Sequence, residues 1–216
     1  MSNLAAIRWL GLALAALSAL AACSAGTPSV TLQGRVRPPS SEGISQPAAL
    51  PARKGSPLTV ANLAGTLGKA DAATVTNDQG DFSFDVRTDA LSEAGDWVKV
   101  AWRHPGRGGP LLARTFRLTR GQTGTIQGDL TDLSTLVSLA LEAERQLDAS
   151  RLLDATGKPR SPQQLENELA TQAAGTGGIL GTFQQRFYGY LAGGATPPGA
   201  DSDLAQDAVE LLFPKQ

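Results

Sequence analysis

Apolar and polar residues alternate along four short segments in the first half of the chain. The segments read VTLQGRV at 30–36, DFSFDV at 81–86, VKVAW at 98–102 and LARTFRL at 112–118. Alternation over four to eight residues, bounded by glycine, proline or asparagine, is typical of a strand with one buried face. Several such strands within about 100 residues predict a small antiparallel β-sandwich, which we place at residues 29–128.

A proline-rich stretch interrupts this β region at residues 38–57. It holds five prolines and few large apolar side chains. Such a composition buries too little apolar surface to offset the entropy of ordering the chain. We therefore expect a flexible insertion here.

Beyond Gly128 the apolar residues recur three and four positions apart, which is the period of an α-helix. The segment SPQQLENELATQAAG has the clearest helix boundaries: Ser161 is an N-cap, Gln164 completes a capping box and Gly175 is a stop signal. Residues 129–216 are therefore predicted to be helical. The fold class expected is α+β, a small antiparallel β-sandwich followed by a helical C-terminal region.

The first 22 residues have the features of an export signal. Arg8 and no acidic residue precede an apolar run at 9–22. This run fits the roughly 7–15 residues of a secretory signal and is shorter than the about 20 that span a bilayer. It ends in Leu20-Ala21-Ala22-Cys23, which resembles the lipobox of bacterial lipoproteins. The resemblance implies that residues 1–22 are removed and that Cys23 is lipidated.

Lipidation at Cys23 would place the protein on a membrane of the cell envelope, with residues 23–28 as a tether. Ser24 after the cysteine resembles the signal for transport to an outer membrane, so in a Gram-negative organism we expect the outer membrane, facing the periplasm or the surface. The alternative is an ordinary signal peptide that leaves Cys23 as a free thiol. A lone thiol in an oxidising compartment is prone to intermolecular pairing, which favours lipidation.

Charge is unevenly divided between the two halves. Residues 23–128 carry 12 basic and 8 acidic side chains, whereas residues 129–216 carry 6 and 12. Strand alternation places three basic residues on the side away from the apolar face, and we predict that they bind an anion. The anion would be the acidic helical tail or an envelope polyanion such as lipopolysaccharide phosphate; a solvated face is the alternative. The candidate anion-binding residues are Lys99, Arg103 and Arg117.

Candidate chemistry is otherwise sparse. His104 lies in RHPGRGGP and is predicted to be a solvated loop tip rather than a general base. NDQGD at 77–81 lacks the ligand count of a calcium loop and predicts a β-turn with Gly80 at positive φ. We expect no catalytic residue, metal or cofactor. Acids two positions apart on the predicted helices, such as Glu166 with Glu168 and Asp201 with Asp203, are expected to be solvated.

Three aromatic residues, Trp97, Trp102 and Tyr188, are candidates for stacking on a carbohydrate. Trp102 alternates with Val98 and Val100 and is expected in the core, whereas Trp97 points the other way and is expected to be exposed. With Tyr188, an exposed Trp97 would give weak support for a glycan-binding surface.

The β segments resemble the carboxypeptidase-regulatory-like domain, a small transthyretin-like β-sandwich. The residues that carry this resemblance are Gly34, Val36, Thr76, Gly80, Phe82 and Phe84. The run GDLTDLSTLVSLAL also resembles the polar turn and leucine-rich helix that follow such domains in many bacterial lipoproteins. The proline-rich stretch at 38–57 departs from the family pattern. The family is mostly non-catalytic, so the resemblance implies a binding role.

These expectations combine into a lipid-anchored, non-enzymatic envelope protein that acts by binding or scaffolding. Its partners would be the membrane, through Cys23, and an envelope polyanion or a protein; nucleic acid is not expected. The alternative is an envelope hydrolase that acts on glycan or peptide through carboxylates from distant positions. Such an enzyme would need an enclosed pocket in which at least two acids converge.

Overall fold

The fold comes from a computed structural model of the 216-residue chain. The structure describes residues 26–39, 52–63, 73–105, 109–147, 149–173, 178–194 and 199–214. The predicted signal segment, Cys23 and the first residues of the tether lie outside this described part, as does Gly175.

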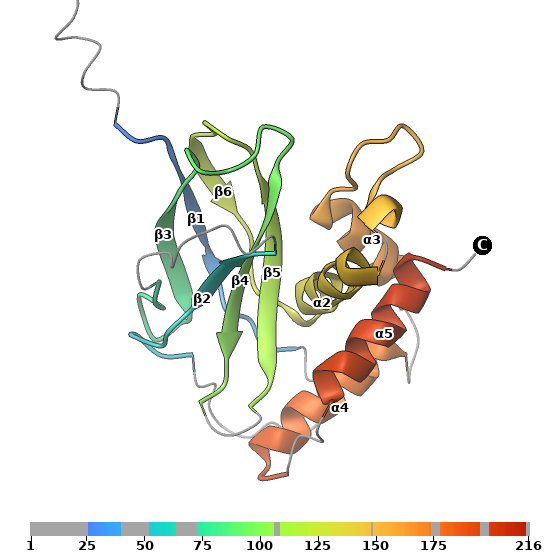
Figure 1. The fold of residues 1–216 in the computed structure, drawn as a ribbon. Coiled ribbons are helices and arrows are strands. Elements are labelled where there is room, and N and C mark those ends of the chain that lie inside the picture. The colour runs from blue at the N-terminus through green and yellow to red at the C-terminus, as the bar shows by residue number, and fades with distance from the viewer. Residues whose placement is uncertain are drawn as a thin grey trace, which may run out of the picture.

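Six strands form two three-stranded sheets that pack as layers (Figure 1). In the first sheet β1 (Ser29–Arg35) lies between β3 (Asp81–Arg87), to which it is antiparallel, and β6 (Gly124–Gln127), to which it is parallel. The second sheet is antiparallel, in the order β2-β4-β5. Its strands are β2 (Thr59–Asn62), β4 (Asp96–Arg103) and β5 (Leu111–Leu118).

The alternating residues of the sequence form the core between the sheets, as predicted. Each has at most 5 % of its surface exposed. They are Val30, Leu32, Phe82, Val86, Val98, Val100, Trp102, Leu112, Phe116 and Leu118. Two short strands, β2 and β6, were not predicted, because their sequences, TVAN and GTIQ, do not alternate apolar and polar residues.

One close backbone contact joins β1 to the chain after β6. A Cβ atom on Gly34 would lie 2.2 Å from the carbonyl oxygen of Gly128. No side chain tolerates that distance, so glycine is required at position 34 by the approach of another backbone segment.

The structure describes the two ends of the predicted insertion at 38–57. Residues 52–57 pair with residues 73–75: the Gly55 amide donates to the Val75 carbonyl at 2.8 Å, and the Val75 amide donates to Ser56. At the other end, the Tyr188 hydroxyl donates to the Pro39 carbonyl at 2.5 Å. Both ends of the insertion predicted at 38–57 are thus hydrogen-bonded to other segments, and its remaining residues, 40–51, lie outside the described residues.

The C-terminal region is helical, which confirms the α+β class. Its elements are α2 (Asp132–Leu147), the 3-10 turn η2 (Ala149–Leu152), α3 (Pro162–Gln172), α4 (Ile179–Leu191) and α5 (Ala200–Leu212). The predicted capping box of α3 is present: Ser161 Oγ accepts from the Gln164 amide, and Gln164 Oε1 accepts from the Ser161 amide. Helix α5 begins two residues before the predicted Ser202, after Gly199 at φ +81°.

Helix α2 packs against β5 through hydroxyl groups, which places a helical layer on the outer side of the second sheet (Figure 1). Thr135 Oγ1 accepts from the Ala113 amide at 2.8 Å, and Ser134 Oγ donates to the Ala113 carbonyl at 2.7 Å. Thr115 donates to Ser138 at 3.0 Å. Because β5 is an edge strand, the Thr135 and Ser134 hydroxyls satisfy backbone groups of Ala113 that would otherwise be unpaired.

Candidate functional site

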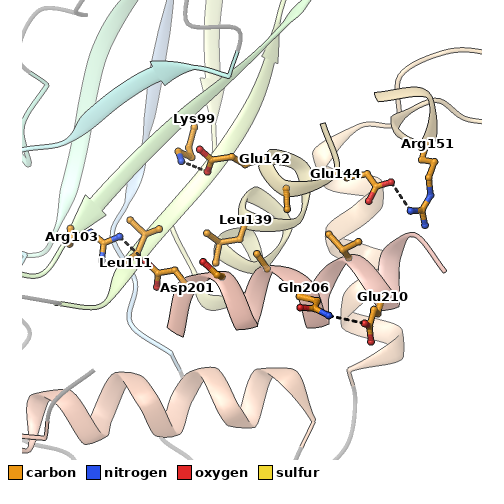
Figure 2. A pocket seen from close by; sticks show the side chains of 14 residues that line it. Lys99, Arg103, Leu111, Leu139, Glu142, Glu144, Arg151, Asp201, Gln206 and Glu210 are labelled. Atoms are coloured by element: carbon orange, nitrogen blue, oxygen red, sulfur yellow. Dashed lines mark hydrogen bonds and ion pairs between the residues drawn. The ribbon is translucent and has the colours of Figure 1, made fainter. Parts of the chain in front are cut away.

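A groove of about 540 Å³ lies between α2 and α5, beside the end of β4 (Figure 2). We call it the α2–α5 groove. Its apolar lining comes from Leu111, Leu139, Ala143, Ala205 and Val209. Its charged lining consists of Lys99, Arg103 and Arg151 and of Glu142, Glu144, Asp201 and Glu210. The groove therefore combines an apolar lining with charges of both signs.

Three ion pairs form among the charged residues of the groove, and two of them connect β4 to the helices. Lys99 Nζ lies 2.5 Å from Glu142 Oε2 on α2, and only 16 % of the Lys99 side chain is exposed. Arg103 Nη2 lies 2.8 Å from Asp201 Oδ2 in the first turn of α5. Both basic residues project from the outer face of the second sheet, as strand alternation predicted.

The third ion pair lies at the other end of the groove, as Figure 2 shows. Glu144 is fully buried, and its Oε1 atom is 2.7 Å from Arg151 Nη1. The Arg151 guanidinium also lies over the ring of Phe213, 5.9 Å from its centroid. Among the residues that the structure describes, Glu144 Oε2 and Arg151 Nη2 have no hydrogen-bond partner.

The structure brings two of the three candidate anion-binding residues into this groove and leaves the third outside. Lys99 and Arg103 meet carboxylates of the helical tail, which is one of the two anions considered from the sequence. Arg117 packs over Trp97, 5.4 Å from the ring centroid, and donates to the Ala94 carbonyl. Burial lowers the pKa of the Arg117 guanidinium from its ordinary value.

The prediction of an exposed Trp97 is wrong. Trp97 is 8 % exposed, because Arg117 covers it on the outer face of the sheet. Trp102 is in the core, as predicted, and Tyr188 is buried as well. Buried rings cannot stack on a sugar, so these three aromatic residues give no support for a glycan-binding surface.

His104 is half-buried rather than a solvated loop tip. Its ring lies 5.2 Å from that of Tyr190 on α4 and 6.0 Å from that of Trp102. Its Nδ1 atom is 2.7 Å from the Pro105 carbonyl oxygen. The histidine therefore packs between β4 and α4.

The expectation that Glu166 is solvated is also wrong. Glu166 is 6 % exposed, and its Oε1 atom lies 3.0 Å from Arg114 Nη2. Burial outweighs the attraction of Arg114 and raises the pKa of this carboxyl. The position of Glu166 three residues before the buried Leu169 was the one signal in the sequence that it faces inward. Asp201 is partly buried by its pairing with Arg103.

The NDQGD segment forms the predicted turn. Asn77 Oδ1 accepts from the amides of Gln79 and Asp81, and Gly80 has φ +87°. The hydrogen bond from Arg35 holds the pKa of Asp81 below its ordinary value. Within the described residues, no group of three potential metal ligands converges, and no helix has the length and apolar character needed to span a membrane.

The chain was compared with protein-family models, curated proteins and solved structures, and none of them matches it. The resemblance to the carboxypeptidase-regulatory-like domain therefore stays a prediction.

Proposed function

We propose that this is a lipid-anchored, non-enzymatic protein of the cell envelope that binds a segment of a partner protein in the α2–α5 groove. The observation that supports this role is the lining of the groove. Apolar side chains from α2, α5 and β5 line it together with three basic and four acidic residues. A peptide can bury apolar side chains against such a lining and present charges to its rim.

The state of the groove carboxylates favours binding over hydrolysis. Three of the four are in ion pairs, with Lys99, Arg103 and Arg151, and Glu210 accepts a hydrogen bond from Gln206. A carboxylate hydrolase needs a carboxyl held protonated at neutral pH beside an ionised one. Pairing with a cation favours the ionised form of a carboxyl, and Glu166, whose pKa burial raises, does not line the groove.

A protein segment fits the groove better than an envelope polyanion does. The basic residues Lys99 and Arg103 already have carboxylate partners. A polyanion would have to displace Glu142 and Asp201 and would also approach Glu210. These carboxylates repel an anion at short range, where salt screens least.

The lipid anchor is tested by the variant Cys23→Ser. We expect the wild-type protein to incorporate radioactive palmitate in a bacterial host and the variant to remain an unlabelled, uncut precursor. Equal labelling of both proteins would overturn the anchor.

The groove is tested with a photo-crosslinking amino acid at Gln206, which is exposed and lines it, and with the same group at Gln172, which is exposed on α3. In intact envelopes we expect one discrete adduct from position 206 and none from position 172. Filling the groove by Ala143→Leu should abolish the adduct. An adduct that persists in the filled groove would overturn this site.

Hydrolysis is tested separately, on isolated cell-wall glycan with its peptides attached. We expect no product from the mature protein. Release of fragments that is lost in Glu142→Gln would instead establish the alternative function, an envelope hydrolase.

A further inference from the structure

The predicted tether enters the β-sandwich at a fixed point. The Pro28 carbonyl accepts a hydrogen bond from the Thr88 amide at 2.9 Å, and the buried Thr88 hydroxyl lies within hydrogen-bond distance of the Pro28 and Gln122 carbonyls. The chain just before β1 is thus held against the loops at 88–95 and 119–123. We call this part of the molecule the tether end.

The tether is too short to let this end move far from a lipid at Cys23. Pro28 lies five positions after Cys23. Each adds at most about 3.6 Å, so the two positions are at most about 18 Å apart. The loops of the tether end must therefore lie close to the bilayer.

The groove begins at the opposite end of the sandwich. β4 leaves the tether end at Asp96 and runs for eight residues to Arg103, which pairs with Asp201. At about 3.4 Å per residue, this strand carries the Arg103 end of the groove about 24 Å from the tether end. Figure 1 shows the same arrangement, with β1 starting at the top and α4 and α5 at the lower right.

The two ends also differ in charge, and the difference favours placing the tether end nearer the membrane. At the tether end Arg87 pairs with Asp89 and Arg120 lies 3.9 Å from Glu93, so the charges there balance. The exposed face of α5 instead carries carboxylates, at Asp203, Asp207 and Glu210. An anionic lipid surface therefore repels the exposed face of α5 at close range. It neither attracts nor repels the tether end, where the charges balance.

We infer that the tether end rests against the anchoring bilayer and that the α2–α5 groove opens away from it, toward a partner segment in the aqueous space. This inference rests on the lipid anchor proposed above. It makes the groove unsuited to lipid headgroups of the anchoring membrane and suited to a partner that reaches it from solution or from another layer of the envelope.

The test uses the lipidated protein in vesicles of phosphatidylethanolamine and phosphatidylglycerol. Because Cys23 is the chain's one cysteine and lipidation consumes its thiol, a second cysteine can be labelled specifically. We would place a fluorophore at Ala90→Cys in the tether end or at Ser202→Cys in the groove, both exposed positions. A lipid with a nitroxide headgroup serves as the quencher.

Quenching at position 90 should exceed quenching at position 202 at least about threefold, because the groove end lies about 24 Å further from the lipid. Inserting ten Gly-Ser residues after Gly26 should reduce quenching at position 90 while the protein still floats with the vesicles. Equal or reversed quenching in a protein that floats would overturn the orientation alone. Failure to float would overturn the anchor and the orientation together.

Discussion

Single residues in this chain act through contacts that their sequence neighbours do not reveal. Glu166 and Glu144 stand among polar residues on helices, yet both are buried against arginines. Burial of an ionised group costs free energy that its partner has to offset. Burial raises the pKa of Glu166, so the protonation of this carboxyl is linked to the stability of the fold.

Glu166 should make the protein less stable as pH rises. Its pKa in the folded protein is raised above the ordinary 4.5, so the folded state holds this proton more tightly than the unfolded state does. The free energy of unfolding of the wild type, relative to Glu166→Gln, should fall as pH increases from about 4.5 through the raised pKa. Urea denaturation of both proteins between pH 4 and pH 7 measures this slope. A difference that grows in favour of the wild type would contradict it.

Gly34 is required by the backbone contact with Gly128. The added methyl in Gly34→Ala would overlap the Gly128 carbonyl, so we expect a loss of about 2 kcal/mol or more in the free energy of unfolding. The control is Gly181→Ala on α4, where a Cβ meets nothing within 4 Å. That change should stabilise the helix by about 0.5–1 kcal/mol. Chemical denaturation should thus shift in opposite directions for the two variants.

At the scale of elements, ion pairs and hydroxyls fasten the helical layer to the second sheet. β4 contributes Lys99 and Arg103, β5 contributes Ala113 and Thr115, and both strands meet α2 or α5 through polar contacts. This interface therefore depends on charge more than the core between the sheets does.

Reversing charge on the outer face of β4 should loosen the helices. Lys99→Glu places two carboxylates together at Glu142, which we expect to cost about 1–2 kcal/mol and to expose α2 and α5 to limited proteolysis. Arg117→Glu is the matched control on the same face, because Arg117 contacts Trp97 and Ala94 instead of a helix. The helices should stay protected in that variant. Equal cleavage in both would show that the Lys99 pair does not hold this layer.

The elements with a local sequence signal were predicted correctly. The features that depend on contacts between distant segments, such as the burial of Trp97 and the α2–α5 groove, were not. Ser161 and Gln164 define the start of α3 by themselves, and the alternation in β1, β3, β4 and β5 identifies the core. Trp97 was misplaced because strand alternation assigns a face but not what covers it. The groove was not predicted at all, since it arises from the docking of α5, which no local pattern encodes.

At the scale of the whole molecule, hydrogen bonds cross the predicted boundary between the β region and the helical region. The Arg35 amide donates to Asp129, the Leu130 amide donates to the Arg35 carbonyl, and the Arg37 amide donates to the Leu130 carbonyl. The start of the helical region is therefore tied to β1, in the middle of the first sheet. We expect the two regions to unfold together.

Intrinsic probes can test this cooperativity. Without residues 1–22 the chain keeps Trp97 and Trp102, both on β4, so tryptophan fluorescence reports the sandwich. Circular dichroism at 222 nm reports mainly the helices. The two denaturation curves should coincide, which is the signature of a two-state transition. A helical transition that precedes the fluorescence change would identify two independently stable units.

The parallel pairing of β1 with β6 also constrains the order in which the first sheet can form. Val30 on β1 is opposite Gly124 on β6. During synthesis β1 is the first strand to be made, and β6, one of its two neighbours in the sheet, is the last. Such long-range pairing belongs to folds that form in milliseconds to seconds rather than microseconds. While the chain emerges from the ribosome or a secretion pore, β1 keeps one edge open until residue 127 has followed. A chain that stops short of β6 would present that edge to other molecules and would be prone to aggregate.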